Sequence, residues 1–220
     1  MYLKDIKINF LGDSITEGAG ASCVEKRYVN YIAENYGAIC RNYGIGGTRI
    51  ARQKTPSECP AYDRDFVSRV DEMDNDADVI VIFGGTNDYG HGDAPLGVFS
   101  DTDPYTFYGG LHTLYTNVIN KYPEALIIVL TPLHRLNEED ERGEFGRKPV
   151  PMANLKAYVD IIREVAEYYS IPVLDLYANS GIQPNVPVLR EKFTADGLHP
   201  NDAGHEKIAK RIAEFIKTLM

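Results

Sequence analysis

The chain has 220 residues, of which 44% are hydrophobic and 25% are charged, and its formal net charge at pH 7 is −9. This length and balance predict one globular domain over residues 1–220 and exclude a disordered or fibrous chain. The acidic charge leaves no basic surface for a phosphate backbone, so we do not expect nucleic acid as a partner.

The first predicted strand ends at a candidate nucleophile. Residues 6–11 are a β-rich, apolar run that turns sharply at Gly12, which places Ser14 at the carboxyl end of a buried strand. A predicted helix at 27–36 ends at a glycine and is followed by a second strand at 38–43. That strand runs into the glycine-rich turn Gly44-Ile45-Gly46-Gly47.

The middle of the chain repeats this alternation. Residues 78–83 (DVIVIF) are nearly all β-branched, as is typical of a central parallel strand covered on both faces. A polar turn, 84–88 (GGTND), follows them directly. A helix is predicted at 105–121, a strand at 125–130, and a helix at 151–169 whose apolar residues fall on one face.

The last predicted strand is 171–176, and a helix with one apolar side closes the chain. Alternating strands and helices indicate right-handed βαβ units, and therefore an α/β fold with a parallel sheet between two helical layers. We expect a three-layer αβα sandwich with a flavodoxin-like, five-stranded sheet. Ligands of such sheets bind at the carboxyl ends of the strands.

Two long segments fit neither a helix nor a strand. Residues 89–104 are rich in Gly, Asp and Pro, and residues 133–149 contain a run of four acidic side chains. Both follow predicted strands at the expected ligand-binding edge, where long loops often bind substrate or form lids. A solvated, charged loop is the alternative interpretation of the acidic segment.

The polar residues at the strand ends match the requirements of acyl transfer, which needs a nucleophile, a base, a residue that orients the base, and donors for the oxyanion. Ser14 can act as the nucleophile and can also donate its backbone N–H. His199 can act as the base, and Asp196, three residues earlier, can hold its imidazole in the required tautomer. Backbone N–H of Gly47 and the amide of Asn87 can donate to the oxyanion.

Each of these motifs also has a purely structural interpretation. Gly-Asp-Ser is a common turn, and GGTND can form a phosphate-binding or structural turn. The Asp-x-x-His segment can precede a helix and contribute to its N-terminal cap, since Asn201 and Asp202 lie where a helix is expected to begin. The joint occurrence of all the motifs favours catalysis over these separate explanations.

Four sequence blocks, in their order and spacing, resemble those of SGNH (GDSL-like) hydrolases: GDSITEG at 12–18, NYGIGGT at 42–48, GGTND at 84–88 and DGLHPN at 196–201. The resemblance spans nearly the whole chain and implies a serine hydrolase that needs no cofactor. It also implies that Ser14, Gly47, Asn87 and His199 are the residues that name the family, with Asp196 completing the triad.

One residue of the first block differs from the family pattern, and one assignment in the second block has an alternative. Ile15 stands where the family nickname has leucine, at a position that packs and does not react. Gly47 is assigned as the oxyanion donor because the family pattern places the donor near the end of its turn, and Gly46 is the alternative.

The other histidines do not form a metal site, because none is paired with another at ligand spacing. His91 and His134 lie in the long segments and are candidates for substrate contact. Arg49, Tyr89 and His134 are our predicted substrate-binding residues, since they lie near the turns that carry the reactive groups.

The predicted reaction is hydrolysis of a carboxylic ester through an acyl-serine intermediate. Polar and aromatic residues near the loops favour a small polar acetyl ester, such as an O-acetylated carbohydrate. The alternatives are a short-chain lipid acylhydrolase, a lysophospholipase or a thioesterase. A non-catalytic module that binds an anion or nucleotide is the alternative from another class, but neither GxGxxG nor GxxxxGK[ST] follows the first strand.

Cysteine content and hydropathy bear on location. Cys23, Cys40 and Cys59 have the spacing of neither a zinc site nor a disulfide framework, so we expect reduced thiols. The N-terminal residues lack a signal-peptide pattern, and no run approaches the ~18 apolar residues of a membrane span. A cytoplasmic protein without membrane insertion is expected.

Overall fold

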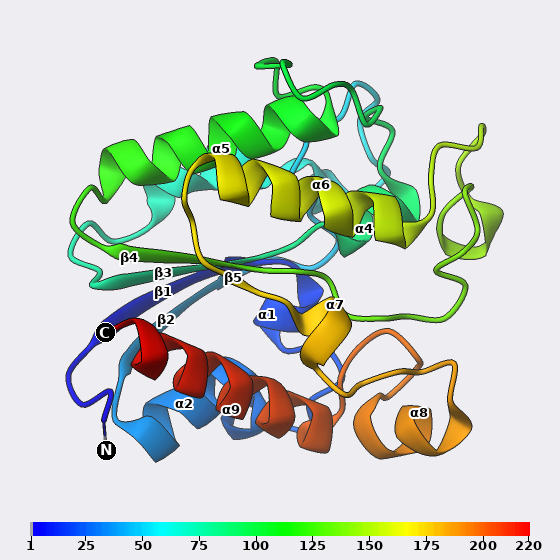
Figure 1. Cartoon of the computed structure of the whole chain (residues 1–220). Coiled ribbons are helices and arrows are strands. Elements are labelled where there is room, and N and C mark those ends of the chain that lie inside the picture. The colour runs from blue at the N-terminus through cyan, green and yellow to red at the C-terminus, as the bar shows by residue number, and fades with distance from the viewer. Residues whose placement is uncertain (1) are drawn as a thin grey trace.

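A five-stranded parallel sheet forms the middle layer of the protein (Figure 1), and the computed structural model describes residues 2–220. The strands follow the order β2-β1-β3-β4-β5, and every neighbouring pair is parallel. Their bounds are Lys7–Gly12 (β1), Ile39–Gly44 (β2), Val79–Phe83 (β3), Leu126–Leu130 (β4) and Val173–Leu174 (β5). The expected five-stranded, flavodoxin-like sheet is confirmed.

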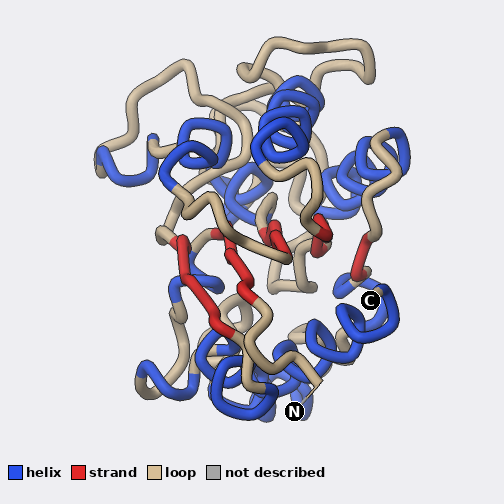
Figure 2. The backbone as a smooth tube through the Cα atoms, turned by 90° about the vertical axis from the view of Figure 1, so that its left-hand side faces the viewer, coloured by secondary structure: helices blue, strands red, loops and turns tan. Residues whose placement is uncertain are grey.

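Helices cover both faces of this sheet, which Figure 2 shows as a row of strands between two helical layers. On one face lie α5 (Phe107–Lys121) and α6 (Leu155–Tyr168), which pack against side chains such as Ile80 and Ile82 of β3. On the other lie α2 (Tyr28–Tyr36) and α9 (Asp202–Leu219). All five residues of β3 are buried, because a strand covered on both faces has no side for water. The three-layer αβα sandwich is therefore confirmed.

Several predicted elements are shorter in the structure than their sequence patterns indicate. The fifth strand, predicted at 171–176, contains only Val173–Leu174, because Asp175 turns the chain by capping the following helix. The helix predicted from residue 151 begins at Leu155, where the side chain of Asn154 accepts the N–H of Ala157. Such side-chain caps satisfy backbone donors that a helix leaves free, and so they define its first residue.

The structure also contains short helices that the sequence analysis did not predict. They are α1 (Ser14–Glu17), η1 (Val24–Lys26), η2 (Pro60–Asp63), α3 (Phe66–Arg69), η3 (Val70–Glu72), α4 (Thr86–His91), η4 (Glu144–Gly146), α7 (Leu176–Asn179) and α8 (Pro187–Phe193). Two of them matter for function, because α1 and α4 follow β1 and β3 at the same end of the sheet (Figure 1). α4 also removes residues 89–91 from the segment expected to be irregular.

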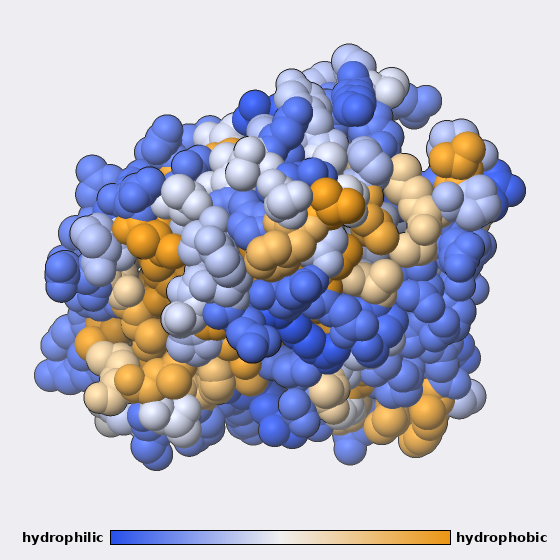
Figure 3. Space-filling model, turned by 45° about the horizontal axis from the view of Figure 1, so that its top comes forward, coloured by the Kyte–Doolittle hydropathy of each residue, from blue (hydrophilic) through white to orange (hydrophobic). Residues whose placement is uncertain are grey.

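The molecular surface is largely polar on the face that Figure 3 shows, where hydrophobic residues gather in separate patches. Within residues 2–220, no helix has the length and apolar character that crossing a membrane requires. The three cysteines are free thiols, and Cys23 and Cys59 are exposed.

Candidate active site

The carboxyl ends of the strands open onto a cavity of about 1080 Å³. Ser14 follows β1, Gly47 follows β2 and Asn87 follows β3, and these three strands are adjacent in the sheet. His199 joins them from the segment before α9, and all four residues line the cavity. Parallel strands end at one edge, so residues far apart in the sequence meet there.

Ser14 is held at the start of α1 by its two preceding residues. The carboxylate of Asp13 accepts the N–H of Ile15 at 3.0 Å and thereby caps the helix. A Cβ at Gly12 would lie 1.9 Å from Oγ1 of Thr16, so only glycine fits this tight turn. Burial raises the pKa of Asp13 to about 6. As the first residue of a helix, Ser14 has no intrahelical acceptor for its N–H, and it presents both this group and its hydroxyl near the cavity.

A chain of hydrogen bonds connects Ser14, His199 and Asp196. Oγ of Ser14 lies 3.0 Å from Nε2 of His199, and Nδ1 of His199 lies 2.7 Å from Oδ2 of Asp196. The other oxygen of Asp196 accepts the N–H groups of Leu198 and His199. Because a carboxylate only accepts, Nδ1 carries the ring proton, and Nε2 is left to accept the hydroxyl proton of Ser14. The arrangement can move that proton to the ring.

The charge states of His199 and Asp196 depend on each other. The hydrogen bond to Asp196 raises the pKa of His199 above its ordinary value, although burial of the ring opposes the shift. Burial acts to raise the pKa of Asp196, but hydrogen bonds from His199 and Leu198 outweigh it and hold that pKa well below its usual range. Asp196 is therefore ionised over the whole pH range in which His199 gains or loses its proton.

The turn after β2 offers one unpaired backbone donor beside Ser14. The N–H of Gly46 donates to Oε2 of Glu17 at 2.9 Å, whereas the N–H of Gly47 has no partner among residues 2–220. Gly47 has a φ of +74°, and a Cβ there would lie 2.3 Å from the ring of Tyr62. The hydrogen bonding thus favours Gly47 over Gly46 as the donor to a ligand.

Asn87 provides a side-chain donor from the first turn of α4. Its Nδ2 donates one proton to the carbonyl of Thr48 at 3.0 Å, which fixes the amide and leaves its second N–H available. The next residue, Asp88, is a positioning residue that the sequence analysis did not single out, although it belongs to the GGTND block. Its carboxylate accepts the N–H groups of Ile50 and Ala51, both at 2.9 Å, and so ties the turn after β2 to α4.

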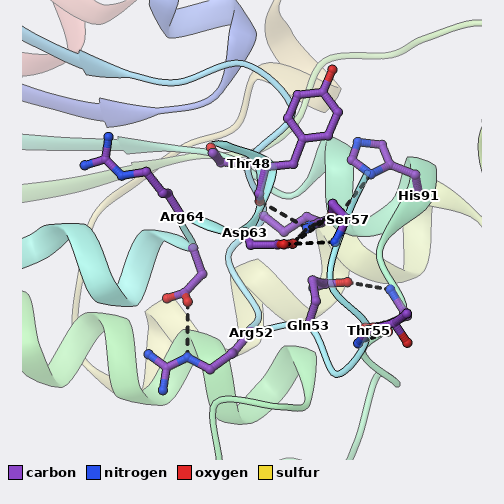
Figure 4. Close-up of polar contacts among 12 residues, drawn as sticks. Thr48, Arg52, Gln53, Thr55, Ser57, Asp63, Arg64 and His91 are labelled. Carbon is purple, nitrogen blue, oxygen red and sulfur yellow. Dashed lines mark hydrogen bonds and ion pairs between the residues drawn. The ribbon is translucent and has the colours of Figure 1, made fainter. Parts of the chain in front are cut away.

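Arg49 lines the cavity, but protein groups hold its guanidinium. Nη2 donates to Asp63 and to Ser57, both at 2.8 Å, and Nη1 lies 3.2 Å from Nδ1 of His91 (Figure 4). The side chain is almost fully buried. Arg49 therefore braces the loop of residues 52–64, which contributes Tyr62 to the cavity wall, and it does not extend freely toward a substrate.

The residues that line the cavity do not include Tyr89 or His134, so their role in substrate binding stays a prediction. Tyr89 is fully buried, packs edge-on against Tyr158 and donates its hydroxyl to the carbonyl of Asn137. It lies two positions after Asn87 on α4, so the helical rotation of ~200° turns it to the opposite side. His134 is hydrogen-bonded to Glu138 at 2.8 Å and packs on a tyrosine.

Other charged and aromatic residues of the cavity had no predicted role, and all of them except Glu17 of the GDSITEG block come from segments without a motif. Glu17 comes from α1, Glu58 and Tyr62 from the loop of residues 52–64, and Glu144 and Arg147 from the long segment 133–149. This segment therefore forms part of the cavity wall. In the part of the chain that the structure describes, no group of three or more His, Cys, Asp or Glu residues is placed to hold a metal ion.

Comparisons with known proteins agree with the geometry. Residues 10–207 match the model of the GDSL-like Lipase/Acylhydrolase family. One solved structure is 34% identical, with a TM-score of 0.84 and 99% of both chains covered. A protein from Lactobacillus plantarum is 29% identical, with a TM-score of 0.83 and 99% of both chains covered. A possible lipase from Chitinophaga pinensis is 21% identical, with a TM-score of 0.71 and coverage of 98% of this chain and 99% of its own.

A search of curated proteins found no match. The family match nevertheless covers most of the chain and includes all four sequence blocks, from the turn before Ser14 to the segment that carries His199. The chain therefore belongs to the GDSL-like lipase/acylhydrolase family of ester-hydrolysing enzymes.

Proposed function

We propose that this enzyme is a serine esterase that removes acetyl groups from small polar alcohols, with O-acetylated carbohydrates as the substrate class. The observation that carries the proposal is the contact chain from Ser14 through His199 to Asp196, beside the unpaired N–H of Gly47 and the amide of Asn87. A nucleophile, an oriented base and oxyanion donors on one cavity wall are what acyl transfer needs.

In the first half-reaction, Oγ of Ser14 attacks the ester carbonyl carbon while Nε2 of His199 takes the hydroxyl proton. The carbonyl oxygen becomes an oxyanion that accepts hydrogen bonds from the N–H groups of Ser14 and Gly47 and from Asn87. Asp196 stabilises the imidazolium that forms. The carbon–oxygen bond to the alcohol then breaks, His199 returns its proton to the leaving oxygen, and acetyl-Ser14 remains.

In the second half-reaction, water takes the place of the alcohol. The oxygen of the water attacks the acetyl carbon while His199 accepts a proton from the water. The donors of Ser14, Gly47 and Asn87 bind the second oxyanion as they bound the first. The bond to Oγ of Ser14 breaks, His199 protonates that oxygen, and acetic acid leaves. The enzyme returns to its starting state without a cofactor.

The cavity wall supports a polar substrate over a long acyl chain. Charged side chains of Glu17, Glu58, Glu144 and Arg147 line it, together with Ser57. The wall also contains apolar residues such as Ile45, Ala61 and Leu198. A long acyl chain would remove water from the charged groups without pairing them, which costs free energy, whereas the hydroxyls of a carbohydrate can hydrogen-bond to them. The lysophospholipase alternative, which requires a long acyl chain, is therefore less favoured, whereas a short-chain lipid acylhydrolase and a thioesterase stay as alternatives.

Two proteins of the same fold act on acetylated polysaccharides. One is an acetyl xylan esterase, 23% identical with a TM-score of 0.64. The other is a two-domain esterase active on acetylated mannans, 23% identical with a TM-score of 0.61, of which this chain covers 50%. At this identity they show only that the scaffold accommodates such substrates.

A combined labelling and substrate experiment tests the proposal. A fluorophosphonate probe should label the wild-type protein stoichiometrically and fail to label Ser14→Ala. If the protein were a non-catalytic binding module, the probe would label neither the wild type nor the variant. Acetate release from acetylated monosaccharides should exceed hydrolysis of octanoyl and decanoyl esters of the same alcohol. A preference for the long acyl chains would reject the substrate class and keep the serine esterase mechanism.

A further inference from the structure

One histidine of the cavity wall has no part in the proposed reaction. His91 ends α4 four residues after Asn87, about one helical turn, so both residues lie on the same side of the helix and both line the cavity. Its segment was predicted to be an irregular loop, and no motif marks it. We infer that His91 is a specificity-determining residue that donates its Nε2 proton to an oxygen in the alcohol part of the substrate, an inference that rests on the proposed function.

The contact with Arg49 settles which ring nitrogen of His91 carries the proton. Nδ1 lies 3.2 Å from Nη1 of Arg49, and a guanidinium nitrogen can only donate. Nδ1 is therefore the acceptor, and in the neutral ring the proton is on Nε2. Figure 4 shows a dashed contact from one ring nitrogen of His91 and none from the other.

The second nitrogen is accessible and unpartnered. Among residues 2–220, no group forms a hydrogen bond with Nε2 of His91, and this atom keeps some solvent-accessible surface. The ring lies 5.9 Å from that of Tyr62, which is partly exposed in the same wall. A fixed, neutral N–H donor beside an aromatic ring, both in the wall of one cavity, suits a hydroxylated ring.

The surroundings keep His91 in this single state. Arg49 cannot swing away, because Asp63, Ser57 and the carbonyl of Tyr62 hold its other terminal nitrogen. Burial and the charge of Arg49 lower the pKa of His91 to about 4. The ring therefore remains a neutral donor over the pH range in which His199 acts as a base.

The donors already assigned to the reacting groups determine which substrate atom is left for His91. The oxyanion already receives three hydrogen bonds, from the N–H groups of Ser14 and Gly47 and from the amide of Asn87, so His91 is assigned to a different oxygen of the substrate. An acetyl group has no other oxygen on its acyl side. The bridging ester oxygen receives its proton from His199. The acceptor for His91 is therefore a hydroxyl or ring oxygen elsewhere in the alcohol part, which a carbohydrate ester supplies and the ester of a hydrocarbon alcohol lacks.

The test compares two acetate esters of six-membered rings: a monoacetylated hexopyranoside, whose other hydroxyls are free, and cyclohexyl acetate, which has no oxygen besides its ester. Acetate release is measured for the wild type, His91→Phe and His91→Gln. Phe keeps a planar ring but removes the donor, whereas Gln can place an amide N–H near the position of Nε2. Thermal midpoints of the variants are recorded alongside.

We expect His91→Phe to lower kcat/KM for the sugar ester about tenfold more than for cyclohexyl acetate, mainly through KM, since one neutral hydrogen bond is lost. His91→Gln should recover part of this difference. An equal loss on both esters, or no loss on either, overturns the inference while leaving the esterase proposal intact. If the wild-type enzyme hydrolyses neither ester, the proposed function and the inference both fall.

Discussion

Replacing Asn87 by alanine removes two hydrogen bonds whose effects can be measured separately. One acts in the resting enzyme and the other in the transition state. One N–H of the amide holds the carbonyl of Thr48 at 3.0 Å in the resting enzyme, and the other is free for the oxyanion. The ester carbonyl of bound substrate carries little charge, so the second bond gains strength only in the transition state. Asn87→Ala should therefore lower kcat with little change in KM.

The contacts of Asn87 set the expected size of two effects, the loss of kcat and the loss of folding free energy. Loss of one oxyanion donor typically lowers kcat by about 10²–10³, or roughly 3–4 kcal/mol, and the N–H groups of Ser14 and Gly47 remain in Asn87→Ala. The carbonyl of Thr48 also loses a buried partner, which costs about 1–3 kcal/mol of folding free energy. The side chain of Asn87 borders the cavity, where water can replace it, so we expect the lower end, about 1 kcal/mol.

Steady-state kinetics and thermal unfolding of Asn87→Ala measure the two effects independently. A loss of about 1 kcal/mol lowers the thermal midpoint of a chain of this size by roughly 2–4 °C. An unchanged kcat in a normally stable variant would remove Asn87 from the oxyanion site. A large loss of stability with kcat and KM both perturbed would instead assign it a structural role in the turn after β3.

Three further changes test the remaining groups. Ser14→Ala should abolish ester hydrolysis in a folded protein, and a variant that keeps more than about a tenth of the wild-type kcat would exclude Ser14 as nucleophile. Activity needs neutral His199, whose pKa is raised, so kcat/KM should rise with pH through a midpoint above the ordinary ~6.5 and fall below it. Asp196→Asn should lower both that midpoint and the rate, and a flat profile from about pH 5 to 9 in the wild type would contradict the base role of His199. Gly47→Ala should lower kcat/KM on the order of 10- to 100-fold, because its Cβ meets Tyr62 and shifts the N–H; a fully active variant would place that donor elsewhere.

Much of the fold follows from local sequence. The β-branched run of β3 and the one-sided apolar pattern of α6 predict a buried parallel strand and an amphipathic helix, and the structure contains both. The turns that carry Ser14 and Asn87 were also predictable, because glycines and polar residues follow directly after apolar strands. A parallel sheet brings such turns to one edge whatever the details of its packing.

Contacts between distant segments decided the rest. Local sequence does not distinguish Gly46 from Gly47, and only the family pattern favoured Gly47. In the structure the two differ because the carboxylate of Glu17, 29 positions from Gly46, accepts the N–H of Gly46. The helix α4 turns Tyr89 into the core and His91 toward the cavity, although the sequence pattern predicted a loop for both. Local patterns express the preferences of neighbours along the chain, whereas hydrogen-bond partners and buried faces are set by groups that meet only after folding.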